Sequence, residues 1–304
     1  MKIVLVGIYY PVAILRYFEA ALRRNKDVEL FTAGPYTGNW IPWNNGMWLK
    51  NIPQAVDKPD LELPREVPIP FAFVEAKLPW VPDLWLQVDA GYHLQGKPKH
   101  GTVFTIGTDP HCLNYDEVRV QSDLFFCMQH CYKKESDIWL PYAYDPIWHD
   151  SQPLRWDNVT INHDFDSMLV GMTYDNRKLL HSKLIASGVK DHLENGPAYL
   201  DARELYWRAK IGWNWSSLQD LTARVFEVMA MGLCPIANHV PDMDRMGWAE
   251  GREYLSFTSV PSAIEKFKWA LQGDNWRDVS DRAYKAVLPH TYDARIKQVL
   301  GELK

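Results

Sequence analysis

The sequence has few cysteines and no long apolar run. Four cysteines in 304 residues, at irregular spacings, indicate free thiols rather than a disulfide framework. No apolar stretch approaches the roughly 20 residues of a membrane-spanning helix. Lys and Arg total 33 against 38 Asp and Glu, and the net charge of −5 argues against a chain that coats nucleic acid, although a local basic groove is compatible with it. We therefore expect a cytoplasmic protein.

The chain begins with an apolar stretch of signal-peptide-like composition. Arg16 interrupts this stretch, and no small-residue cleavage site follows. The pattern predicts a strand over 2–6, a helix over 12–24 and a strand over 28–31, a β-α-β start typical of a parallel, Rossmann-like sheet. Gly7 ends the first strand without a surrounding G-x-G-x-x-G, so a dinucleotide site is not expected there. Gly7 is either a turn that lets backbone approach a ligand or a simple strand-ending turn.

Tryptophan is abundant, with 14 residues in the chain. Trp40, Trp43 and Trp48 lie among Pro, Asn and Gly in the weakly patterned stretch 35–82. Long irregular segments are usually functional or mobile, and indole faces stack on sugar rings or bases. We take these three residues as a candidate acceptor surface; the alternative is that they hold loops onto the domain.

A predicted strand over 102–109 ends in Asp109-Pro110-His111. This is the carboxyl edge of a parallel sheet, where an Asp and a His can orient a substrate or accept a proton from a hydroxyl. The alternative is a proline turn with Asp109 as a helix cap. Nearby Cys127, His130 and Cys131 form one C-x3-C with no second pair, which is a poor zinc signal, so no metal site is predicted.

The centre of the chain predicts a strand, a helix and a strand. The run 211–215 is strand-like, the small residues at 216 and 217 are good N-caps, an apolar helical pattern continues to Gly232, and 233–237 is a buried strand. The helix start then lies at the carboxyl end of a strand, where free N–H groups suit a phosphate. Arg224 and Glu227, spaced i, i+3, are either a solvated ion pair or part of a site.

Residues 224–232, RVFEVMAMG, resemble the R-x-F-E-x-M-A-x-G segment of spore-maturation-protein-like, group 1 glycosyltransferases. These are retaining GT-B enzymes with an E-x7-E motif. The resemblance implies that Glu227 holds the ribose hydroxyls of a sugar nucleotide. It also implies that N–H groups near the helix start hold the diphosphate, at Leu221, Thr222 and Ala223. The first motif glutamate falls on Gln219, which can hydrogen-bond a sugar hydroxyl but carries no charge.

Three further segments resemble the same family. They are LPYAYDP at 140–146, the turn that carries Arg177 and Lys178, and HTY-x-x-R at 290–295. The resemblance implies that Arg177, with Arg224, neutralises the departing diphosphate, since guanidinium matches phosphate geometry. A solvated first helical turn is the alternative for Arg177. Tyr199 falls near the expected nucleotide base and is a candidate stacking partner.

The predicted architecture is α/β with the GT-B fold, in which two Rossmann-like domains face each other with parallel sheets across a cleft. Residues 1–150 form the acceptor-side domain, 165–290 the sugar-nucleotide domain, and the helix 291–304 packs back on the first. We expect retaining, metal-independent transfer of a hexose, with glucose from UDP-glucose as first choice, to an acceptor hydroxyl, without a cofactor. A DNA-modifying glucosyltransferase, a sugar-nucleotide epimerase and a non-catalytic binding module are the alternatives.

Overall fold

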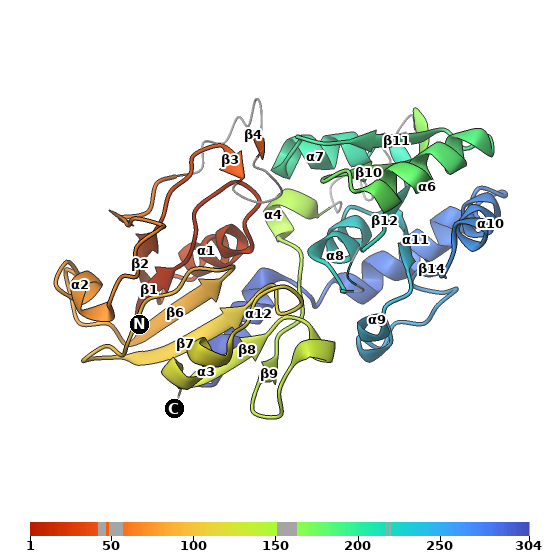
Figure 1. Ribbon diagram of the computed structural model, residues 1–304. Helices are drawn as coiled ribbons and strands as arrows, with labels where there is room; N and C mark the ends of the chain where they lie inside the picture. Colours follow the sequence, from red (N-terminus) through yellow and green to blue (C-terminus); the bar gives the residue numbers. More distant parts are fainter. Residues whose placement is uncertain (42–46, 49–56, 151–162, 217, 219, 304) are drawn as a thin grey trace. The chain divides into compact units, whose positions relative to one another are not determined.

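The computed structural model describes residues 1–41, 47–48, 57–150, 163–216, 218 and 220–303 (Figure 1). The chain divides into two compact units, one of Met1–Pro141 with Ile296–Lys304, and one of Tyr142–Arg295. We call them unit 1 and unit 2. None of the four cysteines, all of which lie in the described ranges, forms a disulfide, as the sequence predicts. Within the described ranges, none of the helices has the length and apolarity needed to cross a membrane.

Unit 1 is built on a seven-stranded sheet in which neighbouring strands pair in parallel, in the order β5-β2-β1-β6-β7-β8-β9. Strand β6 is buried at every position, as expected of a strand that is covered on both faces. A short antiparallel pair, β3 and β4, lies outside this sheet. The strands are β1 (Lys2–Val6), β2 (Glu29–Gly34), β3 (Trp40–Ile41), β4 (Met47–Trp48), β5 (Leu61–Glu62), β6 (Leu84–Asp89), β7 (Thr102–Gly107), β8 (Leu124–Cys127) and β9 (Ile138–Trp139).

The helices of unit 1 are short except for the first and the last. They are α1 (Ile14–Arg24), α2 (Phe71–Glu75), α3 (Asp116–Gln121) and the 3₁₀ turn η1 (His130–Tyr132). The final helix, α12 (Tyr292–Gly301), runs from unit 2 into unit 1. In unit 1 the side-chain amide of Gln298 donates to the carbonyl of Trp139, 3.3 Å away.

Unit 2 contains a five-stranded parallel sheet in the order β11-β10-β12-β13-β14. Its core gathers large side chains such as Trp213, Phe257 and Phe267, all at most 2% exposed. The strands are β10 (Phe165–Val170), β11 (Asp191–Glu194), β12 (Ala209–Asn214), β13 (Cys234–Asn238) and β14 (Leu255–Phe257). The helices are α4 (Pro146–His149), α6 (Asp175–Ala186), α7 (Tyr199–Tyr206), α8 (Ala223–Ala230), α9 (Pro241–Arg245), α10 (Val260–Ala270) and α11 (Asn275–Val287).

The predicted strand–helix–strand unit at the centre is β12-α8-β13, but α8 begins later than expected, at Ala223. The reason lies in Ser216, whose hydroxyl accepts from the N–H of Asp220 at 3.0 Å and so closes a loop instead of capping the helix. The helix lies directly on β12, because a Cβ at Gly212 would come 2.5 Å from Cγ1 of Val228. It ends at Gly232 in the left-handed conformation, as the sequence predicts.

Two of the segments that carry the family resemblance lie side by side in unit 2. The Tyr144 N–H donates to the His290 carbonyl at 3.1 Å, and the Tyr292 N–H donates to the Tyr144 carbonyl at the same distance. The buried guanidinium of Arg295 donates to the Tyr142 carbonyl at 3.1 Å. These contacts fix the segment before α4 and thereby the position at which α4 begins.

Candidate functional site

In unit 2 the candidate residues gather where β10 and β12 end and α8 begins. Arg177 on α6 is only 7% exposed. Its guanidinium donates to the carbonyls of Met172 and Trp215, at 2.7 and 3.1 Å, and to the side-chain oxygen of Asn214, at 2.8 Å. Burial, and then the nearby cation of Arg224, lower its pKa to about 10. Arg177 is therefore not the solvated residue of a first helical turn, and it holds the loops that follow both strands.

The second cation, Arg224, lies over the end of β10. A Cβ at Gly171 would come 2.5 Å from Nη1 of Arg224, so the glycine leaves the space that the guanidinium occupies. Nη1 donates to the hydroxyl of Tyr206 at 3.4 Å, and this hydroxyl accepts from the N–H of Val170 at 3.0 Å. Arg224 lowers the affinity of Arg177 for its proton, and two neighbouring guanidinium groups create a local positive charge, which favours an anion.

Glu227 lies one turn further along α8 and faces a histidine that the sequence reasoning missed. Nε2 of His149 is 3.7 Å from Oε1 of Glu227, and the two side chains are 5% and 13% exposed. The N–H of Asp145 donates to Nδ1 of His149 at 3.1 Å, so the ring proton is assigned to Nε2, on the Glu227 side. Burial lowers the pKa of His149, which is therefore neutral at pH 7.

Asp145 and Pro146 determine where α4, the helix that carries His149, begins. The Asp145 carboxylate accepts from the N–H groups of Ile147 and Trp148, at 2.9 and 3.3 Å, and Pro146 occupies the first turn of α4. This is a favourable helix start, because a side chain satisfies the free N–H groups and proline needs none. The Asp-Pro pair was the available signal, since it predicts a helix start three residues before His149.

The start of α8 holds the three residues that the resemblance assigns to the diphosphate. Leu221 is buried, and Thr222 is the N-cap residue of the helix. The Thr222 hydroxyl accepts from the side-chain amide of Asn214 at 3.2 Å and makes no capping hydrogen bond to α8. Ala223 is the first helical residue. Gln219 lies outside the described residues.

Tyr199, the candidate stacking partner of a base, opens α7 with a positive φ of 54°. The Tyr199 ring is 5% exposed and lies 4.6 Å from the ring of Trp148, centroid to centroid. An aromatic pair thus stands where the sequence suggested a single ring.

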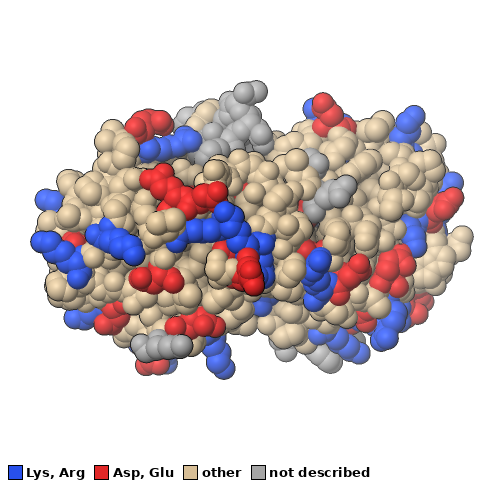
Figure 2. Space-filling model, turned by 60° about the horizontal axis from the view of Figure 1, so that its bottom comes forward, with Lys and Arg blue, Asp and Glu red and all other residues tan. Residues whose placement is uncertain are grey.

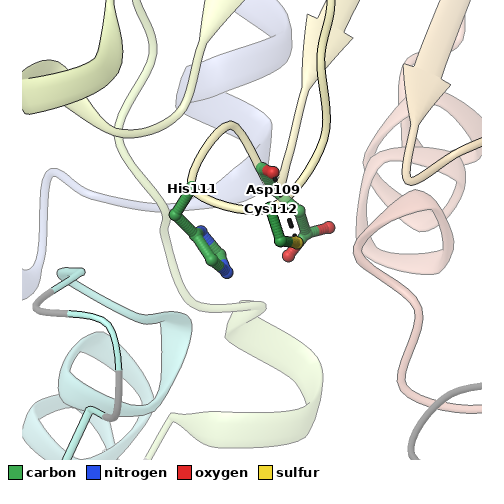
Figure 3. A group of neighbouring side chains, drawn as sticks. All are labelled: Asp109, His111 and Cys112. Carbon is green, nitrogen blue, oxygen red and sulfur yellow. Dashed lines mark hydrogen bonds between the residues drawn. The ribbon is translucent and has the colours of Figure 1, made fainter.

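In unit 1, Asp109, His111 and Cys112 occupy the turn after β7 (Figure 3). One ligand-type atom from each of the three lies within 4.8 Å of the other two. The hydroxyl of Thr108 donates to Oδ2 of Asp109 at 2.5 Å. Nδ1 of His111 is 3.0 Å from Oε1 of Gln129. Asp109 does not cap the next helix, because α3 begins at Asp116 with Tyr115 as its N-cap residue.

The structure gives less information about the remaining candidates, which are Gly7 and three tryptophans. A Cβ at Gly7 would meet Cδ1 of Leu15 at 2.5 Å and the Val88 carbonyl at 2.7 Å, so packing alone requires this glycine. Trp40 is partly buried in β3. Trp43 and the side chain of Trp48 lie outside the described part of the chain. Roles for these residues in ligand binding stay predictions.

The chain resembles known proteins in sequence and in fold. Residues 160–301 match the family model described as glycosyl transferase-like. A solved glycosyltransferase from Rickettsia africae ESF-5 is 11% identical with a TM-score of 0.65, covering 100% of this chain and 97% of that one. An α-glucosyltransferase in complex with UDP and a 13-mer DNA containing an HMU base is 11% identical with a TM-score of 0.63, covering 100% and 99%.

A third structure, sucrose-phosphate synthase from Thermosynechococcus elongatus, is 12% identical with a TM-score of 0.57, covering 99% of this chain and 98% of that one. No curated protein is a significant match. At such identities the solved structures establish the fold, and they confirm the predicted α/β, GT-B architecture.

Proposed function

We propose that the chain, which has the GT-B fold and whose residues 160–301 match a glycosyl transferase-like family model, is a glycosyltransferase that transfers a hexose from a UDP-sugar to an acceptor hydroxyl. Glucose is the proposed hexose, the configuration is retained, and no metal or other cofactor is required. Retention, metal independence and glucose are implied by the family resemblance. The observation that carries the proposal is the grouping of Arg177, Arg224 and Glu227 at the start of α8.

Each member of this group suits one part of a sugar nucleotide. Glu227 accepts hydrogen bonds from the two ribose hydroxyls. Arg224, supported by Arg177 and by the N–H groups at the start of α8, faces the diphosphate. As the bond from the anomeric carbon to the diphosphate oxygen breaks, negative charge builds on the leaving group. Cations and dipoles that are already in place stabilise this charge without reorganisation, and such stabilisation usually accounts for most of an enzyme's rate enhancement.

His149 has a supporting role in this scheme. It touches no substrate, but its Nε2–H faces Glu227 and favours one orientation of the carboxylate. A fixed carboxylate loses less freedom on binding ribose than a mobile one. We therefore regard His149 as a positioning residue for the nucleotide.

Replacing His149 by Ala should weaken UDP binding about 2- to 10-fold, the scale of one hydrogen-bond contribution. His149→Gln, which retains an N–H donor, should restore most of the affinity. Because the wild type must protonate a buried His149 in acid, its stability falls below about pH 6.5, and this fall should be smaller in the Ala variant. UDP titration calorimetry and melting curves at several pH values test both points.

His163→Ala is the matched control. This histidine also has a pKa lowered by burial, but it precedes β10, at the opposite edge of the sheet. Its replacement should leave UDP affinity unchanged. Equal UDP affinity in wild type and His149→Ala would rule out the positioning role.

On the acceptor side we propose Asp109 and His111. Asp109 accepts the proton of the acceptor hydroxyl, and His111 orients the sugar that is transferred. Support comes from their place at the carboxyl end of β7 and from the partners that fix them, Thr108 and Gln129.

DNA as the acceptor is a second candidate, because one structural neighbour over the full chain length was solved with DNA. Charge weighs against it. Figure 2 shows Lys and Arg interspersed with Asp and Glu on the face in view, without a broad tract of one sign. Tight binding to DNA that weakens steeply with salt would favour the DNA acceptor.

The test of the donor is UDP release from a panel of UDP-sugars, with and without EDTA, together with melting curves in the presence of UDP. We expect UDP to raise the melting temperature by several degrees when it is present at about 100 times its dissociation constant. We expect slow hydrolysis of UDP-glucose above the other donors, unchanged by EDTA. Absence of any stabilisation by UDP would refute the donor site, and conversion of a UDP-sugar without UDP release would identify an epimerase.

A further inference from the structure

The turn after β7 brings together a carboxylate, an imidazole and a thiol. Asp109, His111 and Cys112, which we call the Asp-His-Cys cluster, each place one ligand-type atom within 4.8 Å of the other two. In a tetrahedral zinc site with bonds of about 2.0–2.3 Å the ligand atoms lie about 3.5 Å apart, so small side-chain rotations close the cluster around an ion. Figure 3 shows the three side chains on the same side of the turn.

Two members of the cluster are already oriented by other side chains. Gln129, which is 0% exposed, places Oε1 and Nε2 of its amide 3.0 and 2.9 Å from Nδ1 of His111, so the other ring nitrogen is the one left for an ion. Thr108 donates to Oδ2 of Asp109 at 2.5 Å. Metal-binding histidines and carboxylates in proteins are typically held in this way by a hydrogen bond on their far side.

Cys127, one of the cysteines rejected as zinc ligands from the sequence, differs from Cys112 in its environment. Cys127 is buried, and burial raises the pKa of its thiol to about 11, which disfavours the thiolate that binds a metal. Cys112 is exposed, so an ion can reach its sulfur from solvent. The sequence-level rejection of Cys127 therefore does not extend to Cys112.

We propose that the Asp-His-Cys cluster binds one zinc ion through three protein ligands, with the fourth position open to water. Mixed nitrogen, sulfur and oxygen ligands favour zinc over magnesium or calcium, which prefer oxygen alone. The consequence for activity rests on the proposed function: a zinc ion held by Asp109 and His111 withdraws both residues from the acceptor and inhibits transfer. Zinc is then an inhibitor of the enzyme and not its cofactor.

Binding is tested on the full chain without nucleotide or acceptor, so that its outcome does not depend on the proposed function. Zinc is titrated in competition with a chromophoric chelator. We expect one ion per chain, and affinity at least 10-fold lower in Cys112→Ser and His111→Gln. Cys131→Ser is the control, because Cys131 is also exposed but lies outside the cluster. Equal zinc affinity in wild type and Cys112→Ser would overturn the proposal.

Cobalt gives a spectroscopic check of the thiolate ligand. Cobalt-loaded wild type should show a near-ultraviolet sulfur-to-cobalt charge-transfer band that is absent in Cys112→Ser and retained in Cys131→Ser. The opposite pattern would assign the ion to Cys131 and refute the cluster. Inhibition is then measured as each variant's rate with zinc divided by its own rate without zinc. Zinc that binds to Cys112 without inhibiting transfer would leave the metal site intact and refute its link to Asp109 and His111.

Discussion

Asp109→Asn should lower the rate of hexose transfer by about 10²- to 10⁴-fold, the usual contribution of a general base. Asparagine has nearly the same shape and can keep the hydrogen bond from Thr108, but it cannot take a proton from the acceptor hydroxyl. The measurement is kcat for transfer at saturating UDP-sugar, with UDP affinity determined alongside. We expect UDP affinity to be unchanged, because Asp109 belongs to unit 1 and the nucleotide residues belong to unit 2.

The control for this substitution is Asp116→Asn. Asp116 opens α3, a few residues further along the same unit, and its side chain is exposed. Its replacement should leave kcat near the wild-type value. If Asp109→Asn transfers hexose at the wild-type rate, Asp109 is not the base, and the proton must leave through another group.

Glu227→Ala should weaken UDP binding about 10- to 150-fold, which corresponds to the 1.5–3 kcal/mol of a hydrogen bond to a charged group. The two ribose hydroxyls lose the carboxylate that is proposed to accept their hydrogen bonds. The UDP affinity of Glu227→Gln should fall between those of the wild type and Glu227→Ala, since one acceptor oxygen remains. Titration calorimetry with UDP gives the affinities, and circular dichroism establishes that each variant is folded.

Glu265 supplies the control for the second substitution, since it is an exposed glutamate on α10 of the same unit. Glu265→Ala should bind UDP as the wild type does. A folded Glu227→Ala variant with wild-type affinity would end the assignment of Glu227 to ribose. It would also remove the basis for a positioning role of His149.

The sequence predicted the strand–helix–strand unit around α8 because its elements are local. Residues 209–238 contain all of the signals for this unit. They are the apolar period of α8, its end at Gly232 and the buried strands on either side. The late start of α8 could not be predicted in this way. It depends on whether the Ser216 hydroxyl meets a helix N–H or the N–H of Asp220, and both are short-range hydrogen bonds of similar strength.

The parts of the site that were missed depend on contacts between distant segments. His149 becomes relevant only because α4 packs against α7 and α8, which brings its ring to Glu227. Tyr199 was expected to offer an open ring, but Trp148 covers it from the same distant segment. The proximity of Cys112 to Asp109 and His111 has no sequence signal, because zinc-binding patterns are recognised by repeated cysteine pairs, whereas this cluster combines three residue types in one turn.

Gly171 and Arg224 illustrate a constraint on how this chain can change over evolution. The φ of 144° disfavours any side chain at position 171, and the guanidinium of Arg224 lies 2.5 Å from the place of a Cβ there. The constraint on the two positions is therefore unequal: the backbone favours glycine at 171 even in a descendant that has lost the arginine. A descendant that keeps the arginine has a second reason to keep the glycine.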